Sequence, residues 1–138
     1  MANNSLLYII HNDIVKAVSG IGKKTYLGRP KLTDGELTNF VVVEPFTSLL
    51  GNIAGDEDVA MGCYGTLSVY CKAKSDGTLN INSQTDLTQK IMDLFPINTS
   101  HISATKPRIL MRGDDGNGYQ ITQVTYKLRT KYNARQIN

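Results

Sequence analysis

Two histidines, His11 and His101, are the first residues to test for catalytic chemistry. A Ser-His-Asp or Cys-His site needs a histidine that accepts the proton of the nucleophile. Neither histidine lies in a motif known to support such a site, although their separation along the chain leaves a pairing in space open. We expect a surface or capping role for each of them. Because no nucleophile, base and orienting group can be named together, the sequence predicts a protein that is not an enzyme.

Acidic residues cluster at two places, Asp56-Glu57-Asp58 and Asp114-Asp115. Neighbouring carboxylates suit hard cations, which prefer oxygen ligands. Read from Asp115, however, the sequence lacks the third acid, the sixth-position glycine and the closing glutamate of a calcium-binding loop. We therefore expect a solvated hairpin tip at Asp114-Asp115 and no bound metal.

The segment from Gly20 to Thr25 contains a Gly-Lys pair of the kind found in phosphate-binding loops. It lacks the first glycine of a Walker A loop, has Lys24 where a serine or threonine is needed, and follows an expected helix instead of a strand. Cys63 and Cys71 are eight residues apart, which excludes a Cys-x-x-Cys motif, and Cys71 is expected to be a buried free thiol. The sequence therefore predicts no cofactor.

Positive charge is concentrated near the C-terminal end. Residues 106–138 carry a net charge of +5, whereas residues 1–105 carry −2 and the whole chain +3. Such an asymmetry is typical of a surface that meets nucleic acid or an acidic partner.

Two sets of basic residues alternate along expected strands, Lys127, Arg129 and Lys131 on one and Lys72 and Lys74 on the other. Side chains two residues apart on a strand project from one face at a spacing of about 7 Å. Aligned cations repel one another unless they are solvated or matched by negative charge. One interpretation is a strand face kept soluble by charge; the other is contact with DNA phosphates or with Asp56–Asp58 of a neighbouring copy.

The elements that must position these residues follow from the apolar pattern. Leu7, Ile10, Ile14 and Val18 share one face of a helix over about residues 5–19, capped by Asn4 or Ser5. A strand at Leu6–Ile10 with a shorter helix after Asn12 is the alternative. A long exposed loop or a loose hairpin is expected at Lys23–Glu36, and a solvated loop, with a turn of helix as the alternative, at Thr47–Gly62. A strand is expected at Phe40–Val43.

A second strand is expected over Gly65–Lys74, with one face on the core and the other toward solvent or a neighbouring subunit. The pair Ser83 and Asp86 fits a capping box at the start of a helix that Pro96 ends. After a loop to Lys106, two strands are joined through the glycine-rich tip 113–118. The last strand, Tyr119–Tyr132, changes its apolar phase, which predicts a β-bulge near Gln123.

These elements predict one α+β domain over residues 1–138, in the order α-β-β-α-β-β. The sheet is expected to be antiparallel or mixed, with two helices packed on one face. A length of 138 residues with 41% hydrophobic residues suits one compact domain. The chain opens without a basic segment, and its apolar run at Leu6–Ile10 is too short to span a membrane. We expect no signal peptide and synthesis in a reducing cytoplasm.

This order of elements resembles the tail terminator and tail completion proteins of tailed bacteriophages. The pieces that carry the resemblance are Gly65-Thr66-Leu67-Ser68-Val69-Tyr70 leading into a helix, and Asp115-Gly116-Asn117-Gly118-Tyr119 before a last strand ending Tyr126-Lys127-Leu128-Arg129. The likeness covers nearly the whole chain. The link Gly77–Ser83 is longer than the family pattern.

The resemblance implies a virion structural protein of the phage neck or tail. It implies a hexameric ring that caps the tail tube and joins it to the head, with tail-tube and head–tail connector proteins as partners. The genome would pass through the ring, and assembly would take place in the host cytoplasm. Ring closure needs heterologous contacts between neighbouring subunits. A small nucleic-acid-binding module, another connector and a tail-tube subunit are the alternatives.

Overall fold

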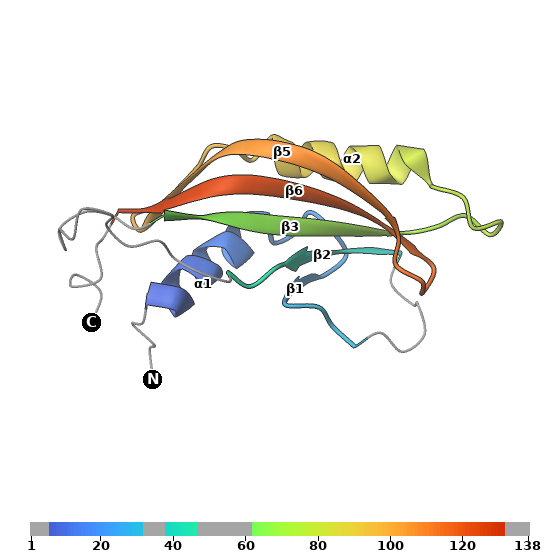
Figure 1. The fold of residues 1–138 in the computed structure, drawn as a ribbon, viewed down its shortest axis with the longest axis horizontal. Helices are drawn as coiled ribbons and strands as arrows, with labels where there is room; N and C mark the ends of the chain where they lie inside the picture. Colours follow the sequence, from blue (N-terminus) through green and yellow to red (C-terminus); the bar gives the residue numbers. More distant parts are fainter. Residues whose placement is uncertain (1–5, 32–37, 47–61, 132–138) are drawn as a thin grey trace.

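The computed structural model describes residues 6–31, 38–46 and 62–131 (Figure 1). Two helices and six strands follow one another as α1 Leu6–Val18, β1 Thr25–Leu27, β2 Asn39–Val43, β3 Gly62–Lys72, α2 Ile81–Met92, β4 Ile97–Asn98, β5 Ile102–Asp114 and β6 Tyr119–Thr130. The predicted caps Asn4 and Ser5, the acidic run Asp56–Asp58 with most of its loop, and the end of the chain after Lys131 lie outside the described residues.

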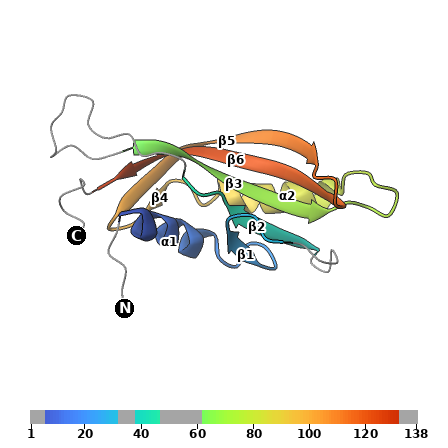
Figure 2. The ribbon, with the colours of Figure 1, turned by 60° about the horizontal axis from the view of Figure 1, so that its bottom comes forward.

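The six strands form one curled sheet in the order β1-β2-β3-β6-β5-β4 (Figures 1 and 2). Only β1 and β2 run parallel, and every other neighbouring pair is antiparallel. The predicted α+β class with a mixed sheet is confirmed.

The predicted order of elements is wrong in two places, because it lacks two short edge strands. One lies in a segment expected to be a loop or a loose hairpin and the other in an expected loop. β1 lies in the segment Lys23–Glu36 and pairs with β2 through Thr25↔Val41 to Leu27↔Val43. β4 lies in the expected loop before Lys106, where β5 also begins at Ile102. Strands of two or three residues take their shape from the neighbour they pair with, so their own sequence carries little signal.

The first helix is present, which excludes the alternative of a strand at Leu6–Ile10. Ile10, Ile14 and Val18 are fully buried, as their spacing on one helix face predicts. Gly20 follows the helix with φ +94°, a conformation that other residues rarely adopt. The cause of helix termination is therefore local.

The second helix begins two residues before the predicted capping box. Its N-cap is Asn80, whose side-chain oxygen accepts a hydrogen bond from the backbone N–H of Ser83 at 3.5 Å. Ser83 therefore lies in the first turn and does not cap it. Leu87 and Ile91 on the same helix are buried.

Side chains from both helices enter one core cluster with the sheet. Ile10, Ile14 and Val18 of α1 and Leu87 and Ile91 of α2 join a cluster that the strands complete with Val41, Val43, Leu67, Val69, Val124, Tyr126 and Leu128. No helix among the described residues is long and apolar enough to cross a membrane.

The pairing of β3 with β6 is continuous from Gly62↔Arg129 to Lys72↔Tyr119. The predicted bulge near Gln123 is therefore wrong, since Gln123 pairs regularly with Ser68. The irregularities lie in β5 instead, between Thr105 and Arg108 and between Met111 and Gly113. The switch of apolar residues from one face of β6 to the other has another cause. Both faces of the sheet are apolar where β6 begins.

Candidate interaction surface on the outer face of the sheet

The face of the sheet turned away from the main core, here called the outer face, is divided into two halves. One half holds an aromatic cluster in which Phe40 stacks on Tyr70, with ring centroids 4.5 Å apart, and Tyr119 meets Phe40 edge-on at 5.2 Å. These three residues are buried, with Tyr26 and Ile121 packed against them. The part of β3 that carries Ser68 and Tyr70 is therefore covered on both faces of the sheet. The predicted contact of the outer face with solvent is wrong for these two residues.

A row of hydrogen bonds crosses the middle of the outer face. The Arg112 Nε donates to the Gln123 Oε1 at 2.7 Å, and the Gln123 Nε2 donates to the Ser68 Oγ at 3.2 Å. The Ser68 hydroxyl in turn donates to the Glu44 Oε2 at 2.7 Å, which also lies 3.5 Å from the Arg29 Nε. This polar row joins β5, β6, β3 and the end of β2, so it marks the border of the aromatic half.

The other half of the outer face is basic. Lys127 and Arg129 project from β6 beside Arg108 of β5, because Arg108 pairs with Thr125 and facing residues in a sheet share a face. Tyr64 of β3 lies opposite Lys127 and is 75% exposed. We call Tyr64, Arg108, Arg112, Lys127 and Arg129 the basic face. None of the ion pairs formed within the described part of the chain involves its four cations.

The structure separates the five basic residues that the sequence grouped together. Lys127 and Arg129 are exposed on the basic face, as predicted. Lys72 and Lys74 are exposed too, but Lys72 pairs with Tyr119 at the opposite end of β3. The eight residue-to-residue steps from Tyr64 to Lys72 span about 27 Å at about 3.4 Å per step. Lys72 and Lys74 therefore cannot share a contact with Lys127.

Lys131 has a structural contact of its own. Its Nζ donates to the Thr99 backbone oxygen at 2.6 Å, and its backbone N–H donates to the His101 oxygen at 2.7 Å. The alternation that placed Lys131 with Lys127 and Arg129 is preserved, but this ammonium group is bound at the turn between β4 and β5.

Sequence reasoning missed Arg108, Arg112 and Tyr64 as members of the surface. Both arginines contribute to the C-terminal positive charge, so the signal was present. Their register against β6, which depends on two pairing irregularities in β5, was the missing information.

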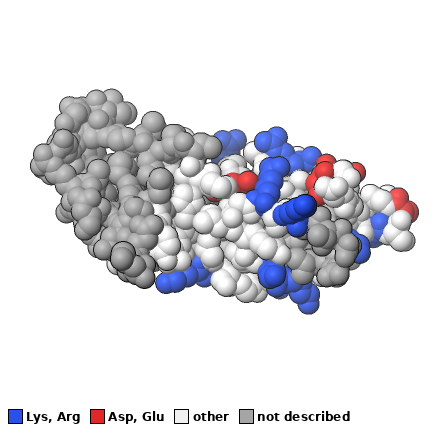
Figure 3. Space-filling model, turned by 90° about the horizontal axis from the view of Figure 1, so that it is seen from below, with Lys and Arg blue, Asp and Glu red and all other residues white. Residues whose placement is uncertain are grey.

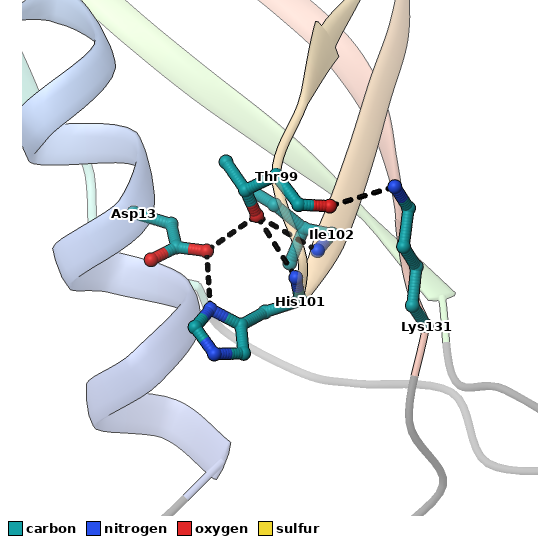
Figure 4. A network of polar contacts seen from close by, with 5 residues as sticks. All are labelled: Asp13, Thr99, His101, Ile102 and Lys131. Atoms are coloured by element: carbon teal, nitrogen blue, oxygen red, sulfur yellow. Dashed lines mark hydrogen bonds and ion pairs between the residues drawn. The ribbon is translucent and has the colours of Figure 1, made fainter.

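The two histidines both have structural contacts. His11 Nε2 accepts a hydrogen bond from the backbone N–H of Phe46 at 2.9 Å, and the two rings are 4.5 Å apart. His101 Nδ1 lies 2.8 Å from the Asp13 Oδ2 of α1 (Figure 4). The nearby hydroxyl of Thr99 donates to the same Oδ2 at 2.5 Å. In this group the hydroxyl is joined to the carboxylate, whereas a catalytic triad joins it to the imidazole.

The acidic turn between β5 and β6 and the two cysteines also have structural roles. The Asp115 Oδ1 accepts hydrogen bonds from the backbone N–H groups of Asn117 and Tyr119, at 2.7 Å and 3.0 Å, within the β5–β6 turn. Burial raises the pKa of the Cys63 and Cys71 thiols to about 11. Within the described ranges, no three acidic, histidine or cysteine side chains gather as a metal site.

Charge on the molecule is distributed in separate patches. Figure 3 shows Lys and Arg side chains at several places on the face seen from below, with acidic groups beside some of them.

Neither a scan of protein-family models nor a search of curated proteins finds a match to this chain.

Proposed function

We propose that this chain is a non-enzymatic structural subunit of a phage neck or tail. In this proposal it forms a homo-hexameric ring that terminates the tail tube and joins it to the head, in contact with tail-tube and head–tail connector proteins. It acts within the virion after assembly in the host cytoplasm. Both helices contribute to the main core cluster, and the basic half of the outer face is exposed and available to partners.

The basic face is the observation that supports the proposal. This surface presents four exposed cations and a 75% exposed tyrosine on one face of the sheet. Tyrosine and arginine are enriched in protein interfaces, where the ring supplies contact area and the guanidinium supplies directed hydrogen bonds. A negatively charged surface of a neighbouring copy would neutralise the positive charge of the basic face. The acidic run Asp56–Asp58 is the candidate for that surface in this sequence.

The second candidate function is nucleic-acid binding, and the same cations favour it. Lys and Arg side chains that neutralise phosphates release counterions, which makes binding depend steeply on salt. Stacking on bases has weaker support, because the buried rings of the aromatic half are closed off and Tyr64 is the one aromatic residue of the basic face. Another head–tail connector or a tail-tube subunit would use the same type of contact.

Charge reversal separates these functions. The variant Lys127→Glu with Arg129→Glu is expected to lose the ring mass and to stop joining tail components, as measured by native mass spectrometry and co-sedimentation. Lys72→Glu with Lys74→Glu makes the same change of charge at the far end of β3 and should retain both properties. Replacing Asp56, Glu57 and Asp58 by lysine in the first variant should restore association if these charges are partners.

The outcome that contradicts the structural role is a wild-type protein that stays monomeric and joins no tail assembly. If labelled DNA then binds with a salt slope that falls by about two in the first variant, the nucleic-acid module is the function.

A further inference from the structure

A second surface lies at the opposite border of the sheet, along the outer edge of β5. β4 pairs only with Ser103 and Ala104 of this strand. From Thr105 to Gly113, β5 has no strand beyond it in the described part of the chain, and Figures 1 and 2 show it as the upper border of the sheet. Half of the backbone N–H and C=O groups of an edge strand point away from its one neighbour, which makes the edge a template for another strand.

The edge is blocked in part. Lys106 has φ +56° and Pro107 cannot donate a hydrogen bond, so the first irregularity of β5 prevents pairing there. A second irregularity follows Met111. Between them Arg108, Ile109, Leu110 and Met111 pair regularly with β6. This four-residue window is the part of the edge that can accept a strand.

An apolar groove runs beside the window on the face that carries α2. It has a volume of about 140 Å³ and is lined by Ile109 and Met111 of β5 and by Ile81, Thr85 and Thr88 of α2. Three of its apolar side chains are far from buried, with exposures of 52% for Ile81, 47% for Ile109 and 61% for Met111. Exposed apolar residues gathered in this way are typical of a binding surface. A strand added to β5 would place alternate side chains in this groove.

The positive charge of the window determines which kind of strand can pair with it. Arg108 and Arg112 project on the outer face, and Lys106 precedes them, so the edge is positively charged. Pairing with β5 of a second copy would bring like charges together. The other edge of the sheet, β1, is preceded by Lys23 and Lys24, so it would repel β5 as well. Charge therefore disfavours a sister copy at either described edge.

We propose that the β5 window binds an extended segment of a partner protein in which apolar and acidic residues alternate. The segment adds a strand to the sheet through backbone hydrogen bonds. Its apolar side chains enter the groove between α2 and β5, and its acidic side chains meet Arg108 and Arg112. The site shares Arg108 and Arg112 with the basic face, but its apolar residues Ile109 and Met111 point to the opposite side of the sheet. The variant Lys127→Glu with Arg129→Glu, which tests the proposed function, leaves all four residues unchanged, so the two proposals can fail separately.

The test uses a short blocked peptide that alternates valine and glutamate. We expect saturable binding that weakens with salt, and slower amide hydrogen exchange at residues 108–111 on binding. A peptide with lysine in place of glutamate should bind on the order of tenfold more weakly, since like charges oppose pairing. Methylation of alternate backbone nitrogens should abolish binding, because it removes the donors of the added strand.

Variants localise the effect. Ile109→Asp is expected to weaken binding about tenfold or more, and because Ile109 is exposed the fold should keep its circular dichroism spectrum. Leu27→Asp makes the same kind of change at the exposed edge residue of β1 and should leave binding unchanged. The proposal is overturned if the glutamate peptide does not saturate, if the lysine or methylated peptide binds as tightly, or if protection appears at β1. Protection of residues 108–111 by self-association of the protein alone would assign the edge to a second copy and would overturn it too.

Discussion

Gly65 and Tyr126 face each other across β3 and β6, and the ring of Tyr126 occupies the space that a side chain at Gly65 would need. A Cβ atom at position 65 would lie 2.3 Å from the Tyr126 Cζ, closer than any real contact. The Tyr126 hydroxyl is buried without a hydrogen-bond partner among the described residues, and burial raises the pKa of this phenol. Gly65 and Tyr126 therefore stabilise the core through the close packing of the ring, and the Tyr126 hydroxyl adds no hydrogen bond within the described residues.

Gly65→Ala is therefore expected to lower the free energy of unfolding by about 1–3 kcal/mol, because the ring must leave its position in a packed core. Urea denaturation measures the change. Gly62→Ala on the same strand is the matched control, since among the described residues its Cβ would meet the Leu128 backbone oxygen at an ordinary contact distance of 3.4 Å.

Tyr126→Phe removes the unpartnered hydroxyl and keeps the ring. Its free energy of unfolding should equal or exceed that of the parent protein by up to about 1 kcal/mol, because an unsatisfied buried hydroxyl is unfavourable. A clear loss of stability in the same urea experiment would show that the hydroxyl has a partner.

At the scale of elements, a polar network joins the first helix to the turn between β4 and β5. Asp13 of α1 binds Thr99 and His101, which lie in the turn between β4 and β5 (Figure 4). The Thr99 hydroxyl also accepts hydrogen bonds from the backbone N–H groups of His101 and Ile102, at 3.0 Å and 3.1 Å. One side chain thus orders a turn and anchors a helix, so the network fixes where α1 lies on the sheet.

Thr99→Val keeps the shape of this side chain and removes its three hydrogen bonds. We expect a loss of about 2 kcal/mol in the free energy of unfolding, from bonds that contribute about 0.5–1.5 kcal/mol each. Asp13→Asn should also destabilise, and the two changes together should cost less than their sum, because they remove a shared interaction. Additive losses in this double-mutant cycle would mean that the two residues act separately.

At the scale of the whole molecule, both cysteines lie in the main core cluster that the helices and the sheet build together. Their thiol pKa values are raised to about 11 by burial, from 9.0. Thiolate is the reactive form, so each thiol is protected by its pKa and by the surrounding core. Access to either sulfur requires the core to open.

Both thiols should therefore react with a disulfide reagent far more slowly in the native protein than in denaturant at about pH 8. The folded state binds these protons more tightly than the unfolded state, so their contribution to stability is complete below pH 9.0 and falls as the pH rises toward about 11. Replacing both cysteines by alanine should make this decline shallower. Rapid reaction of either thiol in the native protein would contradict the burial.

Local sequence patterns are sufficient to predict the elements whose signal lies within one segment. The first helix follows from the spacing of Ile10, Ile14 and Val18, and the glycine-rich tip between β5 and β6 from its glycines. The long strands β3 and β6 were predicted from alternation because each has one face on a large core. The α+β class follows from these elements.

Tertiary structure decided what depends on neighbours. β1 and β4 become strands only through pairing, and the phase change in β6 reports a second apolar surface that Phe40 and Tyr70 complete from other strands. The candidate surface followed the same rule: alternation placed Lys127 and Arg129 together, but strand register brought Arg108 to them and separated Lys72. Register is a property of two chain segments, so neither segment alone contains it.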